Sequence, residues 1–392
     1  MAKLRLAIVG AGPAGIYAAD LMIKAEARDF DVSIDLFDLL PAPYGLVRYG
    51  VAPDHPRIKG IIRALYEVLD RGDIRFFGNV KYGVDLTLED LKRHYNAVIF
   101  ATGAIKDASL NIPGIELDGS YGAADFVNWY DAHPDFPTEW PLNAKEIAVI
   151  GNGNVALDVA RILVKHPEQL LSTDIPDHVY QGLKTSPVTD VHVFGRRGPA
   201  QVKFTPLELR EAVHIEGVDT YVYEEDFKYD EGSQRAIDSN NQTRVMVNTL
   251  ESLRNKEHSG ASRRLHLHFF SGPVEVLGEN GKVAGLKIER TELDGNGGVI
   301  ATGEHRVYPV QAVYRAVGYF GSALDEIPFD PTKGVIVNDG GRVLDAEGEP
   351  LPGVFATGWI KRGPVGLIGH TKSDAMETIA NLIADRENWW QP

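Results

Sequence analysis

Two glycine-rich segments of the chain could each hold the pyrophosphate of a dinucleotide. Residues 10–15 read GAGPAG and follow the apolar run 6–9, and residues 151–156 read GNGNVA and follow the apolar run 147–150. A glycine turn of this spacing between a strand and a helix is typical of dinucleotide binding, because the helix amino terminus offers N–H groups and a positive dipole end to the phosphates. We therefore expect two nucleotide sites in one chain.

The glycines of the first motif have separate expected roles. Gly10 permits the tight turn, Gly12 lets the backbone approach the pyrophosphate, and Gly15 lets the helix pack closely on the strand. In the second motif Ala156 replaces the third glycine, a change that the motif tolerates.

The residues that end the following strand differ in charge between the two motifs. Asp38 comes after the first motif, whereas Arg196 and Arg197 come after the second. A carboxylate suits the hydroxyls of an unmodified ribose, and paired guanidinium groups suit a 2′-phosphate. The arginines could also be solvated surface residues, but their place at the end of a strand favours phosphate recognition. The contrast predicts FAD at the first site and NADP at the second, and electron transfer between them.

The order of apolar runs predicts an α/β fold with two Rossmann-like, three-layer dinucleotide-binding domains, the second inserted in the first. The run 97–100 ends in ATG, and a similar ending at 354–358 suggests that the chain returns to its first domain. We expect an FAD-binding domain of residues 1–105 and 326–392 and an NADP-binding domain of residues 106–325. Predicted strands are 32–37 and 191–194, and predicted helices are 13–27, 155–165, 243–256 and one starting near 371. Residues 224–262 otherwise read as a polar surface excursion, and 295–298 as a tight turn between strands.

Composition excludes several classes of protein. The net charge of −15 argues against nucleic acid and anionic membranes as partners. The chain has no cysteine, which removes disulfides, thiolate chemistry and cysteine-ligated clusters and leaves redox chemistry to a bound cofactor. No metal site is expected, because the histidines lack tight ligand spacing. No run is long enough to span a membrane, and the sequence enters a predicted strand without a targeting segment, so we expect a cytoplasmic protein.

Two further segments have an unusual composition. Residues 41–59 are too rich in proline and glycine for regular structure and too apolar for a solvated loop. They form either a loop that lines a planar ligand or a buried structural loop, and His55 within them is a proton relay or a locally bonded side chain. Residues 358–369 place glycines just before a helix, where backbone N–H groups could meet a flavin edge or ribityl chain. Trp359 there could stack on a ligand or belong to the core.

Together these segments resemble adrenodoxin reductase and the bacterial ferredoxin–NADP reductases of that type. The resemblance runs through nearly the whole chain and rests on GLVRYGVAPDHP (45–56), GNGNVALDVARIL (151–163), GRRGP with the following Gln201 and Phe204-Thr205 (195–205), and GWIKRGPVG (358–366). It implies an FAD-dependent oxidoreductase that takes hydride from NADPH and gives single electrons to a ferredoxin-type iron–sulfur protein.

The resemblance also implies functional residues. His55 and Glu211 match residues beside the flavin and nicotinamide, and Asp38 stands where many relatives have glutamate. The implied FAD contacts, with the glycines of the first motif, are Ala14, Asp38, Leu46, Val80, Trp359, Gly366, Leu367 and Ile368. The implied NADP contacts are Asn152, Gly153, Asn154, Val155, Arg196, Arg197, Glu208 and Gly366.

The sequence departs from the family pattern in two places. Relatives often have a basic residue that contacts NADP near Ala108, a role that we do not assign to Lys106. The family commonly continues beyond the last helix, whereas this sequence stops at 392, so either the member is short or a tail that packs on the NADP domain is missing.

Because ferredoxins are usually acidic, the implied partner needs a basic surface on this acidic chain. The candidate docking residues are Arg48, Arg57, Lys59 and Arg63 in one group and Arg197, Lys203 and Arg210 in another. The rival functions are an NADPH-linked flavin subunit such as the small subunit of glutamate synthase, whose cysteine clusters this chain lacks, a flavin monooxygenase, and a non-catalytic FAD- and NADP-binding protein.

Overall fold

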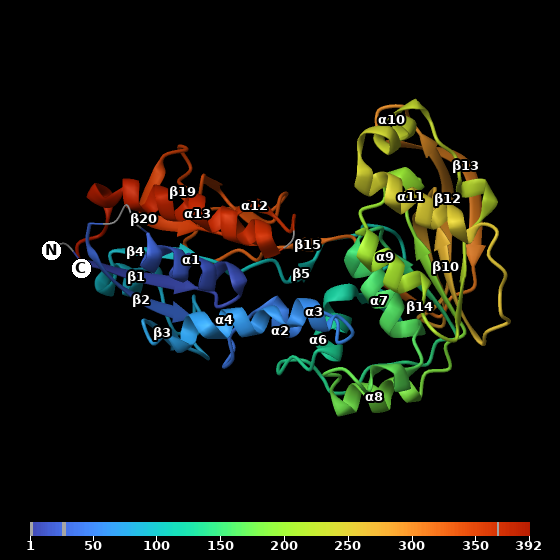
Figure 1. Ribbon diagram of the computed structural model, residues 1–392, viewed down its shortest axis with the longest axis horizontal. Helices are drawn as coiled ribbons and strands as arrows, with labels where there is room; N and C mark the ends of the chain where they lie inside the picture. The colour runs from blue at the N-terminus through green and yellow to red at the C-terminus, as the bar shows by residue number, and fades with distance from the viewer. Residues whose placement is uncertain (1–2, 26–28, 367) are drawn as a thin grey trace. The chain divides into compact units, whose positions relative to one another are not determined.

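The computed structural model describes residues 3–25, 29–366 and 368–392, and these form two compact units (Figure 1). Unit 1 comprises the chain up to Val51, then His55–Lys106 and everything from Tyr319 onward. Unit 2 comprises Ala52–Asp54 and Asp107–Gly318. The second unit is thus inserted in the first, as predicted for the fold class, and the chain crosses at 106 and 319 where the sequence suggests 105 and 325.

Unit 1 is built on a seven-stranded sheet in the order β18-β19-β20-β4-β1-β2-β3. Strands β1 to β4 and β20 run parallel, and β20 pairs with β4 through Val354↔Val98, so the late ATG ending does return to the first sheet. Nearly continuous apolar runs form these strands because both faces of the sheet are covered. The strands are β1 (Lys3–Val9), β2 (Asp31–Phe37), β3 (Ile74–Phe77), β4 (Ala97–Phe100), β18 (Asn338–Asp339), β19 (Arg342–Leu344) and β20 (Pro350–Ala356).

Alternate residues of β1 face two separate cores. Leu6 and Ile8 pack with helices α1, α4 and α13, whereas Ala7 and Val9 pack with α5 and the β16/β17 hairpin. Helices α1 and α13 lie side by side over the sheet (Figure 1). The elements are α1 (Pro13–Lys24), α2 (Leu46–Tyr49), α3 (Pro56–Lys59), α4 (Ile61–Asp70), α5 (Leu88–His94), α12 (Trp359–Arg362), α13 (Ile368–Ala384), β16 (Phe329–Asp330) and β17 (Val335–Ile336).

Unit 2 is built on a six-stranded parallel sheet in the order β6-β14-β7-β8-β10-β9. One face carries helices, and the other carries the three-stranded antiparallel sheet β11-β12-β13. The parallel strands are β6 (Ser120–Gly122), β7 (Glu146–Ile150), β8 (Asp190–Phe194), β9 (Val218–Tyr221), β10 (Arg263–His268) and β14 (Ala312–Arg315). The antiparallel strands are β11 (Ser271–Glu279), β12 (Lys282–Leu293) and β13 (Val299–Tyr308).

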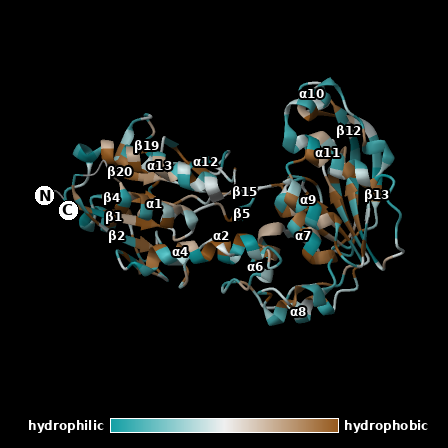
Figure 2. Ribbon diagram, viewed as in Figure 1, coloured by the Kyte–Doolittle hydropathy of each residue, from teal (hydrophilic) through white to brown (hydrophobic). Residues whose placement is uncertain are grey.

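The helices of unit 2 bury one face against β7, β8 and β10. Ile147 and Val149 of β7 join this helical core, while Ala148 and Ile150 point to the antiparallel sheet. In Figure 2 the outer turns of α10 are mostly hydrophilic, which fits its solvated side. The helices are α6 (Ala123–Tyr130), α7 (Asn154–Val164), α8 (Asp177–Lys184), α9 (Pro206–Val213), α10 (Glu231–Ser239) and α11 (Asn241–Leu253).

Several predicted element boundaries are wrong. Helix α1 ends at Lys24, and residues 26–27 of the predicted span lie outside the described chain. Within 224–262 there are two α-helices where the sequence predicts one, because Asp230 and Asn240 each accept a backbone N–H and start an α-helix. Helix α13 begins at 368 and not near 371. Among the described helices, none is both long and apolar enough to cross a membrane.

Candidate active site

The glycine turn of unit 1 is a close crossing of backbone segments. Gly10 has φ of 112°, and a Cβ there would collide with the carbonyl of Ala101, the residue after β4. A Cβ on Gly15 would collide with the carbonyl oxygen of Gly10. Both positions therefore require glycine, and the helix begins directly against the strand.

The turn of unit 2 repeats this geometry. A Cβ on Gly151 would collide with the carbonyl of Ala316, the residue after β14. By contrast, a Cβ on Gly153 would meet no atom of the described chain within 4 Å. The packing of the protein does not require a glycine at this position, but the close approach of a pyrophosphate does. The residues at this turn therefore fit a dinucleotide.

The helices after the two turns offer their N–H groups to a ligand. Gly12 and Gly153 precede α1 and α7, and neither helix has a side-chain cap or an acidic first-turn residue among the described atoms. Pro13 at the start of α1 has no N–H to satisfy. Orphan N–H groups and the positive end of the helix dipole suit a phosphate at each turn.

Asp38 holds the first glycine turn in place. Its Oδ2 accepts a hydrogen bond from Ala11 N at 2.8 Å, and its Oδ1 accepts one from Leu40 N at 2.8 Å. Burial raises the pKa of Asp38 above its ordinary value, while the two N–H donors oppose that rise. Each carboxylate oxygen keeps a second lone pair for a ribose hydroxyl. The sequence predicts the ribose contact but not this structural role.

The loop before α2 lies on the same turn. Tyr44 N donates to Ala11 O at 2.7 Å, and a Cβ on Gly45 would lie 2.9 Å from Gly12 Cα. Leu46 follows as the first residue of α2 and is half-buried. The segment is thus a packed structural loop, and it borders the place where the backbone would approach a pyrophosphate. These contacts agree with the structural interpretation of this part of 41–59, and a role in lining a planar ligand stays a prediction.

Val80 and Trp359 come from two other parts of unit 1. Val80 N donates to Asp38 O at 2.9 Å, which ties this half-buried residue to the end of β2. A Cβ on Gly358 would lie 2.6 Å from the Cβ of Ala14, so the segment leading into Trp359 contacts the first turn of α1. Trp359 itself is half-buried and begins α12.

A buried ion pair fixes the segment that carries Trp359. Asp374 Oδ2 accepts from Gly358 N at 2.6 Å, and its Oδ1 lies 3.0 Å from Lys361 Nζ. The lysine side chain is 5% exposed and also reaches Glu377. Gly366 is exposed with φ of 90°, Ile368 begins α13, and Leu367 lies outside the described residues.

In unit 2 the two predicted phosphate ligands follow β8. Arg196 is exposed and Arg197 half-buried, and over the described residues no side-chain hydrogen bond or ion pair is found for either. Their guanidinium groups can therefore turn to a ligand. Asn152 and Asn154 also make structural contacts: Asn152 O accepts from Lys203 N at 2.9 Å, and Asn154 Oδ1 accepts from Thr205 N at 2.8 Å. Val155 is half-buried in the first turn of α7.

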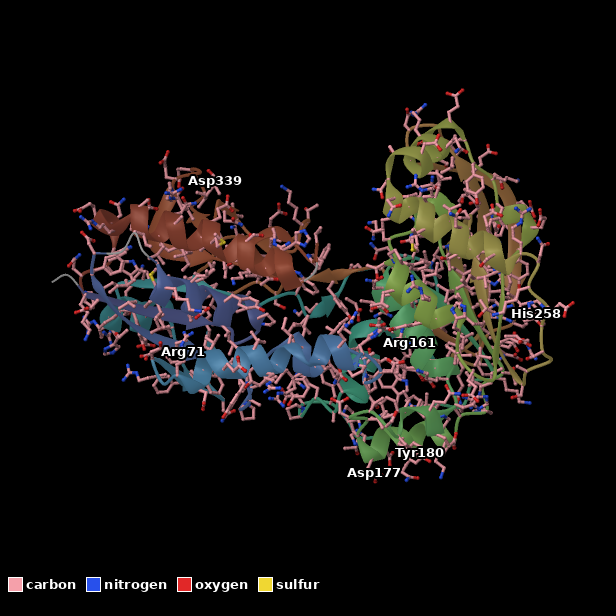
Figure 3. The ribbon with its side chains drawn as sticks, viewed as in Figure 1. Arg71, Arg161, Asp177, Tyr180, His258 and Asp339 are labelled. Atoms are coloured by element: carbon pink, nitrogen blue, oxygen red, sulfur yellow. The ribbon has the colours of Figure 1, made fainter. Side chains whose placement is uncertain are left out.

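Glu208 belongs to a buried ionic cluster around Arg161 on α7, labelled in Figure 3. Arg161 is 1% exposed, and its Nη1 lies 3.4 Å from Glu208 Oε2. It also forms a two-bond pair with Asp54, at 2.6 and 2.9 Å, and contacts Asp158 at 2.9 Å. Burial would raise the pKa of Asp54, but Arg161 and Lys165 hold it well below its usual range. The sequence predicts an NADP contact for Glu208 and does not reveal the cluster.

The two predicted catalytic residues lie in different units. His55 is buried in unit 1, where it precedes α3 and its carbonyl accepts from Lys59 N at 3.0 Å. Glu211 is half-buried on α9 of unit 2. That they meet at one flavin and nicotinamide stays a prediction.

The fold and these turns define a class: oxidoreductases with two dinucleotide-binding domains. Residues 4–193 match the family model described as pyridine nucleotide-disulphide oxidoreductase. The chain is also similar in fold alone to thioredoxin reductase of Lactococcus lactis, with a TM-score of 0.53 at 17% identity over 98% of this chain and 99% of the other.

Closer relatives narrow the class. The chain is 43% identical to NADPH-ferredoxin reductase FprA of Mycobacterium tuberculosis, over 98% of this chain and 84% of that protein. It is 38% identical to the mitochondrial NADPH:adrenodoxin oxidoreductase of Arabidopsis thaliana, over 98% and 82%. A structure of the mycobacterial protein in complex with NADPH matches with a TM-score of 0.91 at 41% identity, over 98% and 85%. The chain belongs to the family of NADPH–ferredoxin and NADPH:adrenodoxin reductases.

Proposed function

We propose that this protein is an NADPH–ferredoxin reductase. It binds FAD and NADP(H) and delivers electrons to a ferredoxin-type iron–sulfur protein. The observation that carries the proposal is the repeated glycine turn, followed by a carboxylate in unit 1 and by two unpaired arginine side chains within the described part of unit 2. The family match over almost the whole chain supports it.

In this proposal the residues of unit 1 bind FAD and those of unit 2 bind NADPH. Bound FAD would supply the chemistry that links a two-electron hydride donor to a one-electron iron–sulfur acceptor. Asp38 accepts from the ribose of the flavin nucleotide while it holds the turn, and α1 faces the pyrophosphate. Arg196 and Arg197 bind the 2′-phosphate of NADPH, and α7 faces its pyrophosphate. His55 and Glu211 are the residues that we propose would lie beside the reacting rings and orient them.

Reconstitution tests the function. The FAD-loaded protein with NADPH should reduce cytochrome c rapidly only when a ferredoxin is added, because the cytochrome then receives electrons through the iron–sulfur protein. A comparable rate without ferredoxin would favour a direct flavin oxidase or monooxygenase. No reduction of either acceptor would favour a binding protein. Fractionation of cells that carry the tagged chain tests the cytoplasmic location, which stays a prediction.

We further propose that the ferredoxin docks on the basic residues of α2, α3 and α4 in unit 1. Arg57 and Arg63 are exposed, and Arg63 has a single weak ion-pair partner among the described residues, Glu67 at 3.7 Å. Arg48 partly covers Tyr44, with its guanidinium 5.1 Å from the ring centre. The alternative group in unit 2 contains Arg197, which the nucleotide already uses. Complementary charge speeds encounter and is screened by salt.

The same assay tests the docking surface. The variant with Arg57→Glu and Arg63→Glu should raise the KM for ferredoxin about ten-fold at low salt and flatten its salt dependence. Reduction of the flavin by NADPH should not change. Arg235→Glu is the matched control, since Arg235 makes a similar exposed pair with Glu231 at 3.7 Å on α10. Equal ferredoxin kinetics in the double variant and the control would contradict docking at α2–α4.

A further inference from the structure

The backbone of the loop after β8, which carries Arg196 and Arg197, is hydrogen-bonded to residues at the start of β11 and near the end of β12. Three successive carbonyls, those of residues 195–197, each accept a hydrogen bond. The donors lie in two neighbouring segments, residues 270–271 at the start of β11 and Thr291 near the end of β12. None of these bonds uses an arginine side chain. The bonds are Ser271 N to Gly195 O at 2.9 Å, Thr291 Oγ1 to Arg196 O at 2.5 Å, and Phe270 N to Arg197 O at 3.1 Å.

The segments that make these bonds are themselves fixed by a buried ion pair. Arg290 Nη2 lies 2.8 Å from Asp226 Oδ1, and the two residues are 7% and 1% exposed. Both also bind Phe269: Arg290 Nη1 donates to its carbonyl at 2.9 Å, and Asp226 Oδ2 accepts from its N–H at 3.0 Å. The corner between β10 and β11 therefore has little freedom to shift.

The aliphatic part of the Arg196 side chain lies beside Gly272 of β11. A Cβ on Gly272 would lie 3.5 Å from Arg196 Cγ, which is ordinary van der Waals contact. The loop is thus bonded through its carbonyls and lies beside Gly272 at its first arginine, while the guanidinium groups make no bond within the described chain. Such preorganisation lowers the ordering cost when a ligand binds.

We propose that Thr291 is a positioning residue that strengthens the preference for NADPH over NADH. Thr291 supplies the one side-chain hydroxyl among the three donors, and the Asp226–Arg290 pair keeps its strand in register with the loop. Its bond fixes the carbonyl of Arg196 and hence the direction of the arginine side chain. This inference rests on the proposed function, in which Arg196 and Arg197 bind the 2′-phosphate.

Thr291→Val tests the inference, because valine keeps the shape and removes the hydroxyl. We expect the KM for NADPH to rise about five-fold, equivalent to about 1 kcal/mol, with kcat unchanged. The KM for NADH should not change, because NADH has no 2′-phosphate. Thr291→Ser keeps the donor and should restore most of the NADPH affinity. A loss of folding alone would affect both nucleotides equally, and urea unfolding of each variant checks for it.

Two further variants separate the outcomes. Thr249→Val is the matched control, since Thr249 Oγ1 donates to a backbone carbonyl on α11, at 2.9 Å from Val245 O. The pair Arg196→Ala with Arg197→Ala tests the proposed phosphate site itself. If that pair leaves the NADPH preference unchanged, the phosphate assignment fails. If the pair abolishes the preference but Thr291→Val behaves like the control, the inference about Thr291 is overturned and the phosphate assignment stands.

Discussion

At the scale of single residues, two carboxylates of unit 1 hold the backbone of the glycine turn and of the segment before α12 in place. Asp38 binds the N–H groups of Ala11 and Leu40, and Asp374 binds that of Gly358. A carboxylate that accepts backbone N–H groups stabilises a glycine-rich segment that has few side-chain contacts of its own. Such residues act on a nucleotide through the geometry of the backbone.

Replacing Asp374 with asparagine should therefore weaken FAD retention. The change removes the charge that faces the buried side chain of Lys361 and weakens the bond to Gly358 N. We expect a loss of stability of about 1.5–3 kcal/mol, typical of a hydrogen bond to a charged group, and faster FAD release, measured by the rise in flavin fluorescence on heating.

A second variant controls for the charge of Lys361. Glu377 contacts the same lysine at 2.6 Å but is 59% exposed. Glu377→Gln should change stability by less than about 1 kcal/mol and leave FAD release at the wild-type rate. Equal effects of the two substitutions would show that the segment before Trp359 does not depend on Asp374.

At the scale of elements, strands β8 and β10 carry a buried stack of histidines. His192 Nδ1 lies 2.9 Å from His268 Nε2, and His266 Nε2 lies 2.7 Å from Asp190 Oδ1. Burial lowers the pKa of His192 to about 3 and also lowers those of the other two histidines. The groups that face the stack are Arg264, Arg290, Arg306, Tyr221, Tyr223, Tyr308 and His258.

This stack should make unit 2 sensitive to acid. The pKa of each of the three histidines is lower in the folded state than its ordinary value, so the histidines take up protons on unfolding below about pH 6.5. Their contribution to stability is therefore full above that pH and is lost as the pH falls toward the folded pKa of His192, about 3. The expected slope is up to about 1.4 kcal/mol per pH unit for each neutral histidine.

Urea unfolding followed by circular dichroism between pH 7.5 and 5 measures this slope. His192→Phe should lower the slope of the free energy of unfolding against pH by the contribution of one histidine. The matched variant His94→Gln, at an exposed histidine, should leave the slope at the wild-type value. Wild-type stability that is independent of pH over this range would contradict the account of the stack.

The sequence predicts those parts of the fold and site that depend on neighbouring residues, and it does not predict contacts between residues that are distant in sequence. The glycine turns and the strands beside them are local patterns, so the residues at 10–15 and 151–156 reveal them. The support of the arginine loop is different, because Thr291 lies 95 positions from Arg196 and binds only its carbonyl. A backbone contact places no demand on residue type at the partner. The burial of Lys361 beside Asp374 likewise depends on a residue distant in sequence, and no local pattern reveals it.

At the scale of the whole molecule, both units contain a strand, a glycine turn and a helix, but the residues that follow the next strand are acidic in unit 1 and basic in unit 2. Gly10 packs against the carbonyl of Ala101, just after β4, and Gly151 packs against the carbonyl of Ala316, just after β14. Both turns therefore cross a neighbouring strand end in the same way. In the proposed function, the carboxylate of unit 1 and the arginines of unit 2 distinguish the nucleotides. The central claim is that NADPH bound through unit 2 reduces FAD bound through unit 1.

An anaerobic titration of the FAD-loaded protein with NADPH tests that claim most directly. The flavin absorbance near 450 nm should bleach with about one equivalent of NADPH, and much more slowly with the same amount of NADH. A flavin that stays oxidised in excess NADPH would contradict the account.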